Sequence, residues 1–372
     1  MYCYTSSMVD KLKISVLFSE DREDHKETHD EVVDEVSNAL GENGHKVSLL
    51  GIHNDVRELL DKLDEQKPDL VFNLCETFDD NYYGEMYITA LLDMLRIKFT
   101  GTRPAGMALR QDKAITKQLL AFYDVPCPQY ATFALGQLEF AGKMRFPLFV
   151  KPLKKDASAG IDESSLVNDY ESLMKKINFI HKELRDTALV EEYIEGREFY
   201  VSVLGNDPRE SLPLVELDFS KLPQNYKHIY TEKAKFDEDS EVYNLINFGV
   251  ATDLPQEIRN KITMIGIKAA NALQVVDYAR VDIRLAQDGI PYVVEVNANP
   301  YLERTAEFAV AALQAGMGYS TLVNKIVDVA WERWRHEDSR RKLQKIKREL
   351  VKKEKEPKKE KESEKEEKST KS

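Results

Sequence analysis

The stretch ARVDIRLAQDGIPYVVEVNANP, from Ala279 to Pro300, holds two apolar runs on either side of Asp288-Gly289. An Asp-Gly dipeptide favours the two-residue turn of a β-hairpin, so the pattern predicts that residues 287 and 290 pair across the turn. Because side chains alternate along a strand, four polar residues then share one face of the hairpin. They are Arg280, Asp282, Glu295 and Asn297. The opposite face, which we expect in the core, carries Val281, Ile283, Val294 and Val296.

The predicted register places Asp282 opposite Glu295 and Arg280 opposite Asn297. Directly opposed carboxylates lie about 4.5–5.5 Å apart at Cβ and repel each other unless a cation lies between them. Carboxylate and amide oxygens suit Mg²⁺, which commonly binds one or two protein carboxylates together with substrate phosphates. The pattern therefore predicts a metal site on this face. The alternative is a solvated polar face on which Arg280 neutralises the acids.

Length and composition are those of a globular chain. The 372 residues suffice for two or three domains, and a hydrophobic content of 42% is ordinary for a folded protein. The three cysteines are far apart and form no disulfide or metal motif. The amino-terminal sequence lacks the layout of a signal peptide, and no apolar run approaches the ~20 residues of a membrane-spanning helix. We therefore expect a cytoplasmic protein without membrane contact.

The last segment, residues 336–372, has a composition of its own. From Arg340 onward it carries 15 Lys and Arg against 8 Glu, although the whole chain has a formal net charge of −12. Such a sequence cannot bury a core, so we expect a charged and largely disordered tail. Its mixed charge and lack of aromatic residues favour a solubilising role, and we expect no nucleic-acid partner.

The remaining segments predict an α/β (α+β) protein of three regions. Residues 1–103 alternate strand-like segments, the last of them at 97–102, with helix-like ones, which indicates an open, mostly parallel sheet. Residues 104–190 begin with a helix over 111–123 and continue with a strand and a second helix. Residues 191–335 contain the hairpin, one helix before it and two after it.

Three further places could carry chemistry. Lys151 ends a buried strand, and the small residues at 157–160 leave backbone N–H groups free to approach phosphate oxygens. In VEEYIEGREFYV (190–201), a turn between two strands can offer backbone groups to a purine and a carboxylate to ribose hydroxyls. Lys113 follows Asp112, whose charge suits the first turn of a helix. Taken singly, each place has a simpler explanation. Lys151 could be a surface lysine, the turn within 190–201 could be an acidic surface turn, and Lys113 could be an ordinary exposed lysine.

The order and spacing of these places resemble the ATP-grasp superfamily, and specifically its D-alanine–D-alanine ligase branch. The resemblance covers about residues 68–335. The hairpin stretch is its most specific part, and VFNLCETFDDNYYGEMYITALLDMLRIKFTGT and MALRQDKAITKQLLAFYDVPCPQY support it. It implies an ATP-grasp fold, in which an N-terminal open parallel sheet (1–103) precedes two α+β subdomains that sandwich ATP. The central one (104–190) would be the lid, and the next (191–335) would be the catalytic subdomain.

The resemblance also implies a role for each site residue. The residues that would bind ATP are Lys113, Lys151, Ser158, Gly160, Glu191, Glu192, Ile194, Glu198 and Lys235. Among them, Lys113, Lys151 and the loop from Ser158 would hold the phosphates, and Glu198 would hold the ribose. The residues that would serve catalysis are Arg280, at the transferring phosphoryl group, together with Lys235 and Ser158. The ligands of Mg²⁺ (or Mn²⁺), with two ions expected, would be Asp282, Glu295 and Asn297.

The implied reaction joins a carboxylate to an amine. The carboxylate attacks the γ-phosphate of ATP to give an acyl phosphate, and the amine then attacks the acyl carbon and releases phosphate. Fixed positive charge and a closed site suit this chemistry, because water would hydrolyse the acyl phosphate. The implied substrates are small and amino-acid-like, and paired subunits are common in the family.

The sequence departs from the D-alanine pattern where the substrates would bind. Tyr301 stands where the family carries a glycine, and ERTAE (303–307) replaces a hydroxyl-rich stretch. SEDREDHKETHD (19–30) replaces a glycine-rich turn, and the usual loop serine and tyrosine are Ala157 and Phe236. We therefore predict an ATP-dependent carboxylate–amine ligase and rank an authentic D-alanine–D-alanine ligase behind it.

Two other functions stay open. The chain could bind ATP without catalysis, as a regulator, although binding alone does not need the complete polar face of the hairpin. His25 and His29, four residues apart, could share a helical face and bind a metal ion. The lysine and acids between these histidines favour a solvated face instead.

Overall fold

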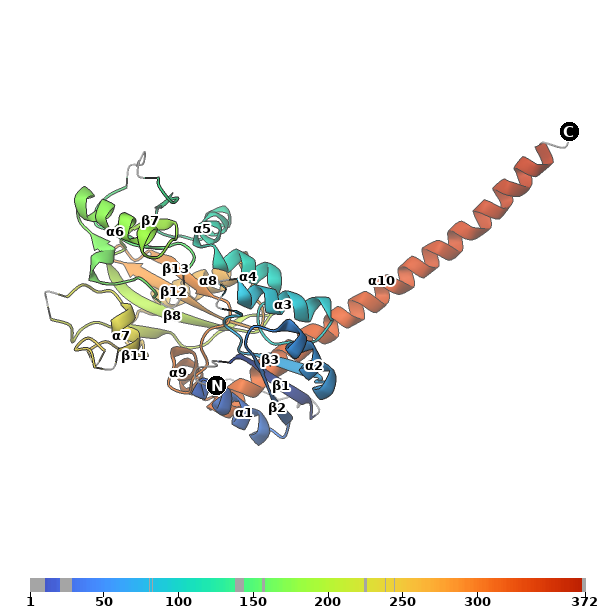
Figure 1. Ribbon diagram of the computed structural model, residues 1–372, viewed down its shortest axis with the longest axis horizontal. Coiled ribbons are helices and arrows are strands. Elements are labelled where there is room, and N and C mark those ends of the chain that lie inside the picture. Colours follow the sequence, from blue (N-terminus) through green and yellow to red (C-terminus); the bar gives the residue numbers. More distant parts are fainter. Residues whose placement is uncertain are drawn as a thin grey trace.

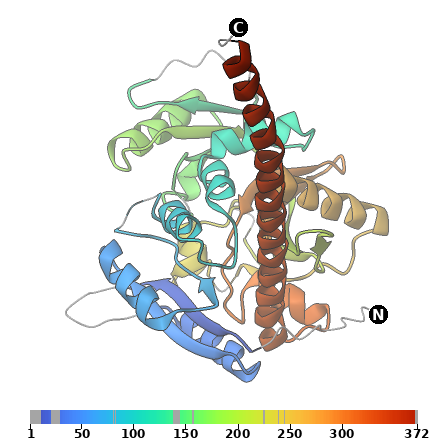
Figure 2. The same ribbon diagram turned by 90° about the vertical axis from the view of Figure 1, so that its right-hand side faces the viewer.

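The computed structural model describes residues 11–20, 29–79, 81, 83–137, 144–155, 158–223, 226–237, 239–243 and 245–369, without the side chains of Phe236 and of residues beyond 349. Three sheets with helices against them form the body of the molecule, and one long helix projects from it (Figure 1, Figure 2).

The first part of the chain forms a three-stranded parallel sheet of order β2-β1-β3, as predicted. Its elements are β1 (Lys13–Ser19), α1 (Glu31–Glu42), β2 (Lys46–Ile52), α2 (Val56–Gln66), β3 (Leu70–Asn73) and α3 (Gly84–Met94). The side chain of Asp30 caps α1 by accepting a hydrogen bond from the N–H of Val32. The strand expected at 97–102 is wrong, because only a single bridge joins Phe99 to Val71.

The middle of the chain forms an antiparallel sheet of order β4-β7-β5-β6, here called the lid sheet, with α6 packed on it. Its elements are α4 (Pro104–Gln111), α5 (Lys113–Phe122), β4 (Tyr130–Phe133), β5 (Leu148–Pro152), η1 (Glu163–Ser165), β6 (Leu166–Val167), α6 (Tyr170–Lys182) and β7 (Ala188–Glu192). The helix predicted over 111–123 is confirmed as α5, and α4 directly before it is an additional helix. Two helices meet at Asp112, whose side chain accepts the N–H groups of Ala114 and Ile115 and thereby starts α5.

The third sheet, here called the large sheet, has the order β11-β10-β8-β12-β13 with β9 beside β8. Its elements are β8 (Gly196–Leu204), β9 (Glu210–Ser211), β10 (Val215–Asp218), α7 (Glu232–Phe236), β11 (Asn247–Val250), α8 (Gln256–Ala272), β12 (Tyr278–Ala286), β13 (Pro291–Asn297) and α9 (Glu307–Gln314). Phe199 and Val201 belong to a core with α8, whereas Tyr200 belongs to a core with Phe308 of α9. The two helices therefore cover opposite faces of the sheet. The domain limits predicted at 103/104 and 190/191 stay predictions.

The hairpin of β12 and β13 has the predicted pairing of Asp282 with Glu295 and of Arg280 with Asn297. Its turn differs from the prediction, however. The N–H of Ala286 bonds to the carbonyl of residue 290 at 3.0 Å, so the loop is one residue longer than expected and residues 287 and 290 do not pair.

A β-bulge compensates for the longer loop. The register shifts between Asp282 and Ile283, so Ile283 pairs with Val293. As a result Val293 is fully buried in the core, and Val294, which was predicted there, lines a cleft instead.

The carboxyl-terminal helix α10 (Tyr319–Ser369) contacts α1 and α9 and then leaves the body of the protein (Figure 1). The disorder predicted for residues 336–372 therefore differs from the structure, which continues the helix to Ser369. Lys and Glu are good helix formers and attract each other at a spacing of four residues, which accounts for a helix without a core. In the part of the chain that the structure describes, no helix is both long and apolar enough to cross a membrane.

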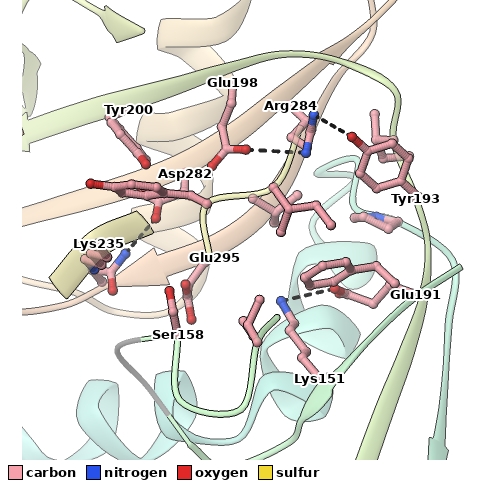
Figure 3. A pocket seen from close by; sticks show the side chains of 18 of the residues that line it. Lys151, Ser158, Glu191, Tyr193, Glu198, Tyr200, Lys235, Asp282, Arg284 and Glu295 are labelled. Carbon is pink, nitrogen blue, oxygen red and sulfur yellow. Dashed lines mark hydrogen bonds and ion pairs between the residues drawn. The ribbon is translucent and has the colours of Figure 1, made fainter. Parts of the chain in front are cut away.

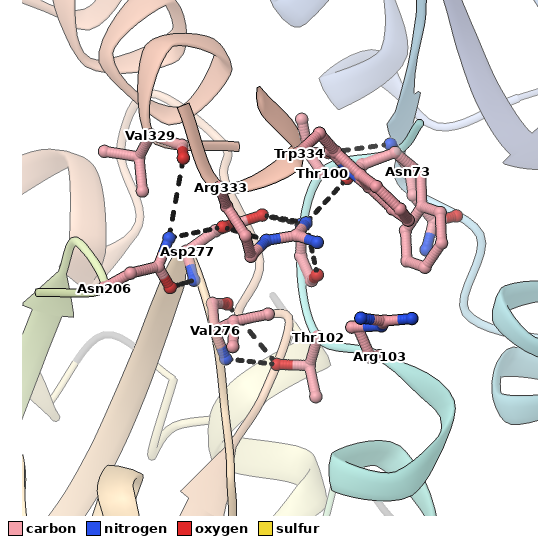
Figure 4. A network of polar contacts seen from close by, with 12 residues as sticks. Asn73, Thr100, Thr102, Arg103, Asn206, Val276, Asp277, Val329, Arg333 and Trp334 are labelled. Carbon is pink, nitrogen blue, oxygen red and sulfur yellow. Dashed lines mark hydrogen bonds and ion pairs between the residues drawn. The ribbon is translucent and has the colours of Figure 1, made fainter. Parts of the chain in front are cut away.

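A buried aspartate ties the sheets to this helix (Figure 4). The carboxylate of Asp277, which is 0% exposed, accepts the Nε and Nη2 groups of Arg333 on α10 at 2.8 and 2.7 Å. It also accepts the side-chain amide of Asn206 and the N–H of Gly101, both at 2.9 Å. The N-terminal part, the large sheet and α10 thus meet at one carboxylate.

We predict that Asp277→Asn lowers the free energy of unfolding by about 3–5 kcal/mol, because it leaves the Arg333 charge buried without its counter-ion. Asp338→Asn removes the same charge from an exposed pair with Lys98 and is expected to cost at most about 1 kcal/mol. Denaturant unfolding of both variants measures this. Equal losses in the two variants would contradict the role given to Asp277.

Candidate functional site

A cleft lies between the lid sheet and the large sheet and encloses about 900 Å³, part of it open to solvent (Figure 3). The lid sheet and its loops contribute Phe149, Lys151, Ser158, Ile161, Glu191 and Glu192. The large sheet contributes Glu198, Tyr200, Arg280, Asp282, Arg284, Val294, Glu295 and Asn297.

The alternation of β12 explains how its polar side chains reach the cleft. Arg280, Asp282 and Arg284 line the cleft, while Val281 and Ile283 between them are fully buried against α8. A strand with this pattern must bury its valine and isoleucine, so the charged side chains are held on the other face. The core thereby fixes the direction of the site residues.

Eleven of the thirteen residues predicted for the site line this one cleft. They are Lys151, Ser158, Glu191, Glu192, Ile194, Glu198, Lys235, Arg280, Asp282, Glu295 and Asn297. Lys113 lies beside it, with its Nζ 2.7 Å from the carbonyl of Lys155 and 3.7 Å from Glu295. Gly160 does not line the cleft. Its N–H donates a hydrogen bond to the side chain of Glu232 on α7 at 3.2 Å.

Arg280 and Asp282 form a two-pronged ion pair in the cleft wall. The Nε and Nη2 groups of Arg280 donate to the two oxygens of Asp282 at 2.8 and 3.0 Å, and its Nη1 donates to Glu307 at 3.1 Å. The guanidinium also lies over the ring of Tyr200, 4.8 Å from the ring centre. The alternative of an arginine that neutralises the acids is therefore correct for this pair. These two side chains are buried, however, since Arg280 and Asp282 are 8% and 6% exposed.

Arg280 does not neutralise all the acids. Burial raises the pKa of Asp282 to about 6 against the effect of Arg280, and Glu295 and Glu198 act in the same direction as burial. Burial likewise raises the pKa of Glu198, to which Glu295 adds. The cleft therefore has an excess of negative charge around β12 and β13, which a bound cation would stabilise.

The donor atoms at this place fit a hard divalent cation. Two carboxylates and the amide oxygen of Asn297 are the ligands that magnesium takes together with phosphate oxygens. Within the described ranges, no group of three or more His, Cys, Asp or Glu side chains is placed to hold a metal ion by itself. Of the two histidines considered for zinc, His29 pairs with Asp34 at 3.2 Å, and His25 lies outside the described residues.

A buried glutamate between two lysines lies on the lid side of the cleft. The carboxylate of Glu191 contacts the ammonium of Lys117 and, at 3.1 Å, that of Lys151. Burial alone would raise the pKa of Glu191, but the two ammonium groups outweigh it and hold the pKa below its usual range. One positive charge of the three groups remains unbalanced, at the end of the cleft where Lys151 is expected to meet phosphate.

Two segments meet at the mouth of the cleft. The loop at 158–161 comes from the lid region, and α7 carries Lys235. Besides the bond from Gly160, the N–H of Glu232 donates to the carbonyl of Ile161 at 3.2 Å. The loop that is predicted to bind phosphate and the helix that carries Lys235 are therefore in contact. Ala157, at the start of this loop, lies outside the described residues.

Sequence reasoning missed four residues that shape the cleft. Lys117 follows Lys113 by one helical turn, and Arg284 follows Asp282 by two strand positions, so spacing could have found both. Tyr200 faces the cleft two positions after Glu198 on β8 and could have been found in the same way. Glu307 had no local signal, because it meets Arg280 only through the fold.

Comparison with known proteins bears directly on this geometry. Residues 121–328, more than half of the chain, match the family model described as D-ala D-ala ligase C-terminus. The chain belongs to this family. An uncharacterized protein of Sinorhizobium fredii is 34% identical over 312 residues, which is 82% of this chain and 88% of that protein. A D-alanine–D-alanine ligase of Aquifex aeolicus is 29% identical over 294 residues, 78% of this chain and 92% of that protein.

Solved structures agree on the fold. The crystal structure of D-alanine–D-alanine ligase from Bacillus anthracis complexed with ATP aligns with a TM-score of 0.70 at 22% identity. The alignment covers 88% of this chain and 99% of that one. The ATP-grasp fold predicted from the sequence is confirmed.

We predict that Glu191→Gln lowers the free energy of unfolding by about 3 kcal/mol at neutral pH, because it leaves two lysines buried without their counter-ion. Glu192→Gln is the matched control, since Glu192 lines the same cleft but is only partly buried, and we expect a loss below about 1 kcal/mol. Denaturant titrations at several pH values measure both effects.

The pH dependence has a definite sign. The folded-state pKa of Glu191 is depressed, so its stabilisation is present above the usual glutamate range and is lost as pH falls through the folded-state pKa. The difference between wild type and Glu191→Gln should therefore shrink in acid. A difference that grows in acid would show that the lysines do not hold this carboxylate ionised.

Proposed function

We propose that this protein is an ATP-dependent carboxylate–amine ligase that joins two small amino-acid-like substrates through an acyl phosphate. The observation that carries the proposal is the convergence on one cleft of Lys151, Lys235 and Arg280 with the opposed acids Asp282 and Glu295. Membership in the D-alanine–D-alanine ligase family supports it. The same cleft argues against a regulator that only binds ATP, because binding alone does not need this whole set.

We assign the nucleotide to the cleft as follows. The phosphates lie against Lys113 and Lys151, whose excess positive charge suits them. The adenine lies along the segment from Glu191 and Glu192 to Ile194, and Glu198 accepts the ribose hydroxyls. The solved relative in complex with ATP supports a nucleotide as the ligand.

We assign the metal site to Asp282, Glu295 and Asn297, with Mg²⁺ (or Mn²⁺) and two ions in the loaded site. When bound, the metal would offset the negative charge that develops during phosphoryl transfer. Arg280, fixed by Asp282 and Glu307, supplies a positive charge that does not move during the reaction. Contact between the loop from Ser158 and the helix with Lys235 keeps water from the acyl phosphate.

The second candidate is an authentic D-alanine–D-alanine ligase. The names of relatives such as that of Aquifex aeolicus favour it. Against it, Tyr301, in place of the family's glycine, donates a hydrogen bond to Asp30 at 2.7 Å. In the replaced stretch 303–307, Arg304 lies 3.6 Å from Glu35. Both departures fall in segments where the family pattern would bind the substrates, so we propose substrates other than two D-alanines.

A substrate screen tests the proposal. Purified protein with ATP, Mg²⁺ and pools of D- and L-amino acids is expected to release phosphate with at least one pool, and mass spectrometry of that mixture should show an amide product. Release with D-alanine alone would establish the second candidate. Silence across all pools together with tight ATP binding would favour the non-catalytic protein.

We predict that Glu295→Gln lowers the rate of phosphate release by at least about a hundredfold, since one of the two opposed carboxylates is lost. Asp288→Asn removes an acidic charge from the loop of the same hairpin, away from the cleft, and should leave the rate unchanged. Steady-state kinetics with the substrate found in the screen compare the two. Wild-type turnover in Glu295→Gln would remove this residue from the metal site.

A further inference from the structure

We infer that Arg284 is a positioning residue of the nucleotide site, which holds Glu198 and the β7–β8 turn in place for the ribose of the bound nucleotide. The inference rests on the proposed function to the extent that it needs ATP as a ligand. It does not need the ligase reaction.

The position of Arg284 follows from the strand. It is the third side chain of β12 on the cleft face, after Arg280 and Asp282, and it is 7% exposed. The first two side chains lie at the predicted metal and phosphate region, and Arg284 lies beside Glu198 and Tyr193 (Figure 3). It therefore belongs to the end of the cleft assigned to ribose and base.

Arg284 joins three parts of the cleft wall. Its Nη2 donates to the hydroxyl of Tyr193 and to the carbonyl of Gly196, both at 3.1 Å, so it fixes both ends of the β7–β8 turn. Its Nη1 donates to the carbonyl of His228 at 3.0 Å, in the segment that leads to α7. The guanidinium also lies over the ring of Tyr193, 4.7 Å from the ring centre.

The contact with Glu198 completes this arrangement. Nη1 lies 3.5 Å from a carboxylate oxygen of Glu198, across the two paired strands β8 and β12. Burial raises the pKa of Glu198, and Arg284 is the largest of the effects that oppose this. An ionised carboxylate only accepts hydrogen bonds, which is what two ribose hydroxyls require of it. Arg284 thus affects both the place and the charge of Glu198.

A positioning role for Arg284 predicts a specific defect in nucleotide binding when this residue is replaced. If Arg284 only stabilised the fold, its loss would weaken the binding of every nucleotide by the same factor. If it positions Glu198, its loss removes the advantage that the ribose hydroxyls give to ATP over its deoxy analogues. The ratio of affinities therefore separates the two roles, and it needs no turnover.

The experiment measures Kd values of ATP, 2′-deoxy-ATP and 3′-deoxy-ATP with Mg²⁺ for the full chain by calorimetry. Wild type is expected to bind ATP about tenfold more tightly than the weaker-binding deoxy analogue, the difference that a hydrogen bond to a charged group makes. Arg284→Met should reduce this ratio to less than about twofold. Arg284→Lys, which keeps the charge but not the planar fork, should give an intermediate ratio.

Arg197→Met is the matched control. Arg197 also sits on the large sheet and binds two acids, Glu216 and Asp253, both at 2.6 Å, but it does not line the cleft. Its loss should leave the ratio of affinities unchanged. An Arg284→Met variant that keeps the tenfold ratio overturns the inference, and so does a wild type that binds all three nucleotides equally. A wild type that binds none of them overturns the proposed function instead.

A second comparison covers the case in which Arg284→Met does not fold. Glu198→Gln is expected to lose the preference for ATP by itself, and adding Arg284→Lys should lower the ratio no further. If Arg284→Lys lowers the affinity ratio by the same factor in the wild-type protein and in the Glu198→Gln variant, the two residues act independently and the inference is wrong.

Discussion

Two carboxylates that face each other across β12 and β13 are the constraint to which the rest of the cleft responds. Asp282 and Glu295 are paired in register, and Glu198 on the neighbouring strand adds a third acid nearby. Buried like charges are costly unless partners compensate for them. Arg280 compensates for Asp282, and Lys113 lies 3.7 Å from Glu295. Burial, with smaller contributions from Glu295 and Glu198, raises the pKa of Asp282 to about 6 in spite of Arg280.

The lid side of the cleft has the opposite imbalance. Glu191 is buried between Lys117 and Lys151, so that group carries one positive charge in excess. A polyanion with a divalent cation bound to it would match both sides at once, since its phosphates would meet the lysines and its cation would meet the acids. The charge pattern of the two sheets is therefore best understood as one arrangement.

The sequence was sufficient for the part of this arrangement that depends on local periodicity. The hairpin, its polar face and the pairing of Asp282 with Glu295 were predicted, although the reasoning was right only because a longer loop and a β-bulge cancel each other. The bulge has no signature in the residue pattern, so the burial of Val293 in place of Val294 could not be predicted. Glu307 could not be predicted either, because only the packing of α9 brings it to Arg280.

Two segments that depart from the family pattern contact each other although they lie far apart in the sequence. Tyr301 reaches Asp30, and Arg304 is held by Glu35 through both its backbone N–H, at 2.9 Å, and its side chain. These contacts span about 270 positions of the chain, so no local pattern reports them. Partly exposed polar contacts add little to stability, and their effect lies in fixing the loop after β13 against the start of α1. The two departures thus form one contact surface, which is how a change of substrate on an unchanged nucleotide site would be built.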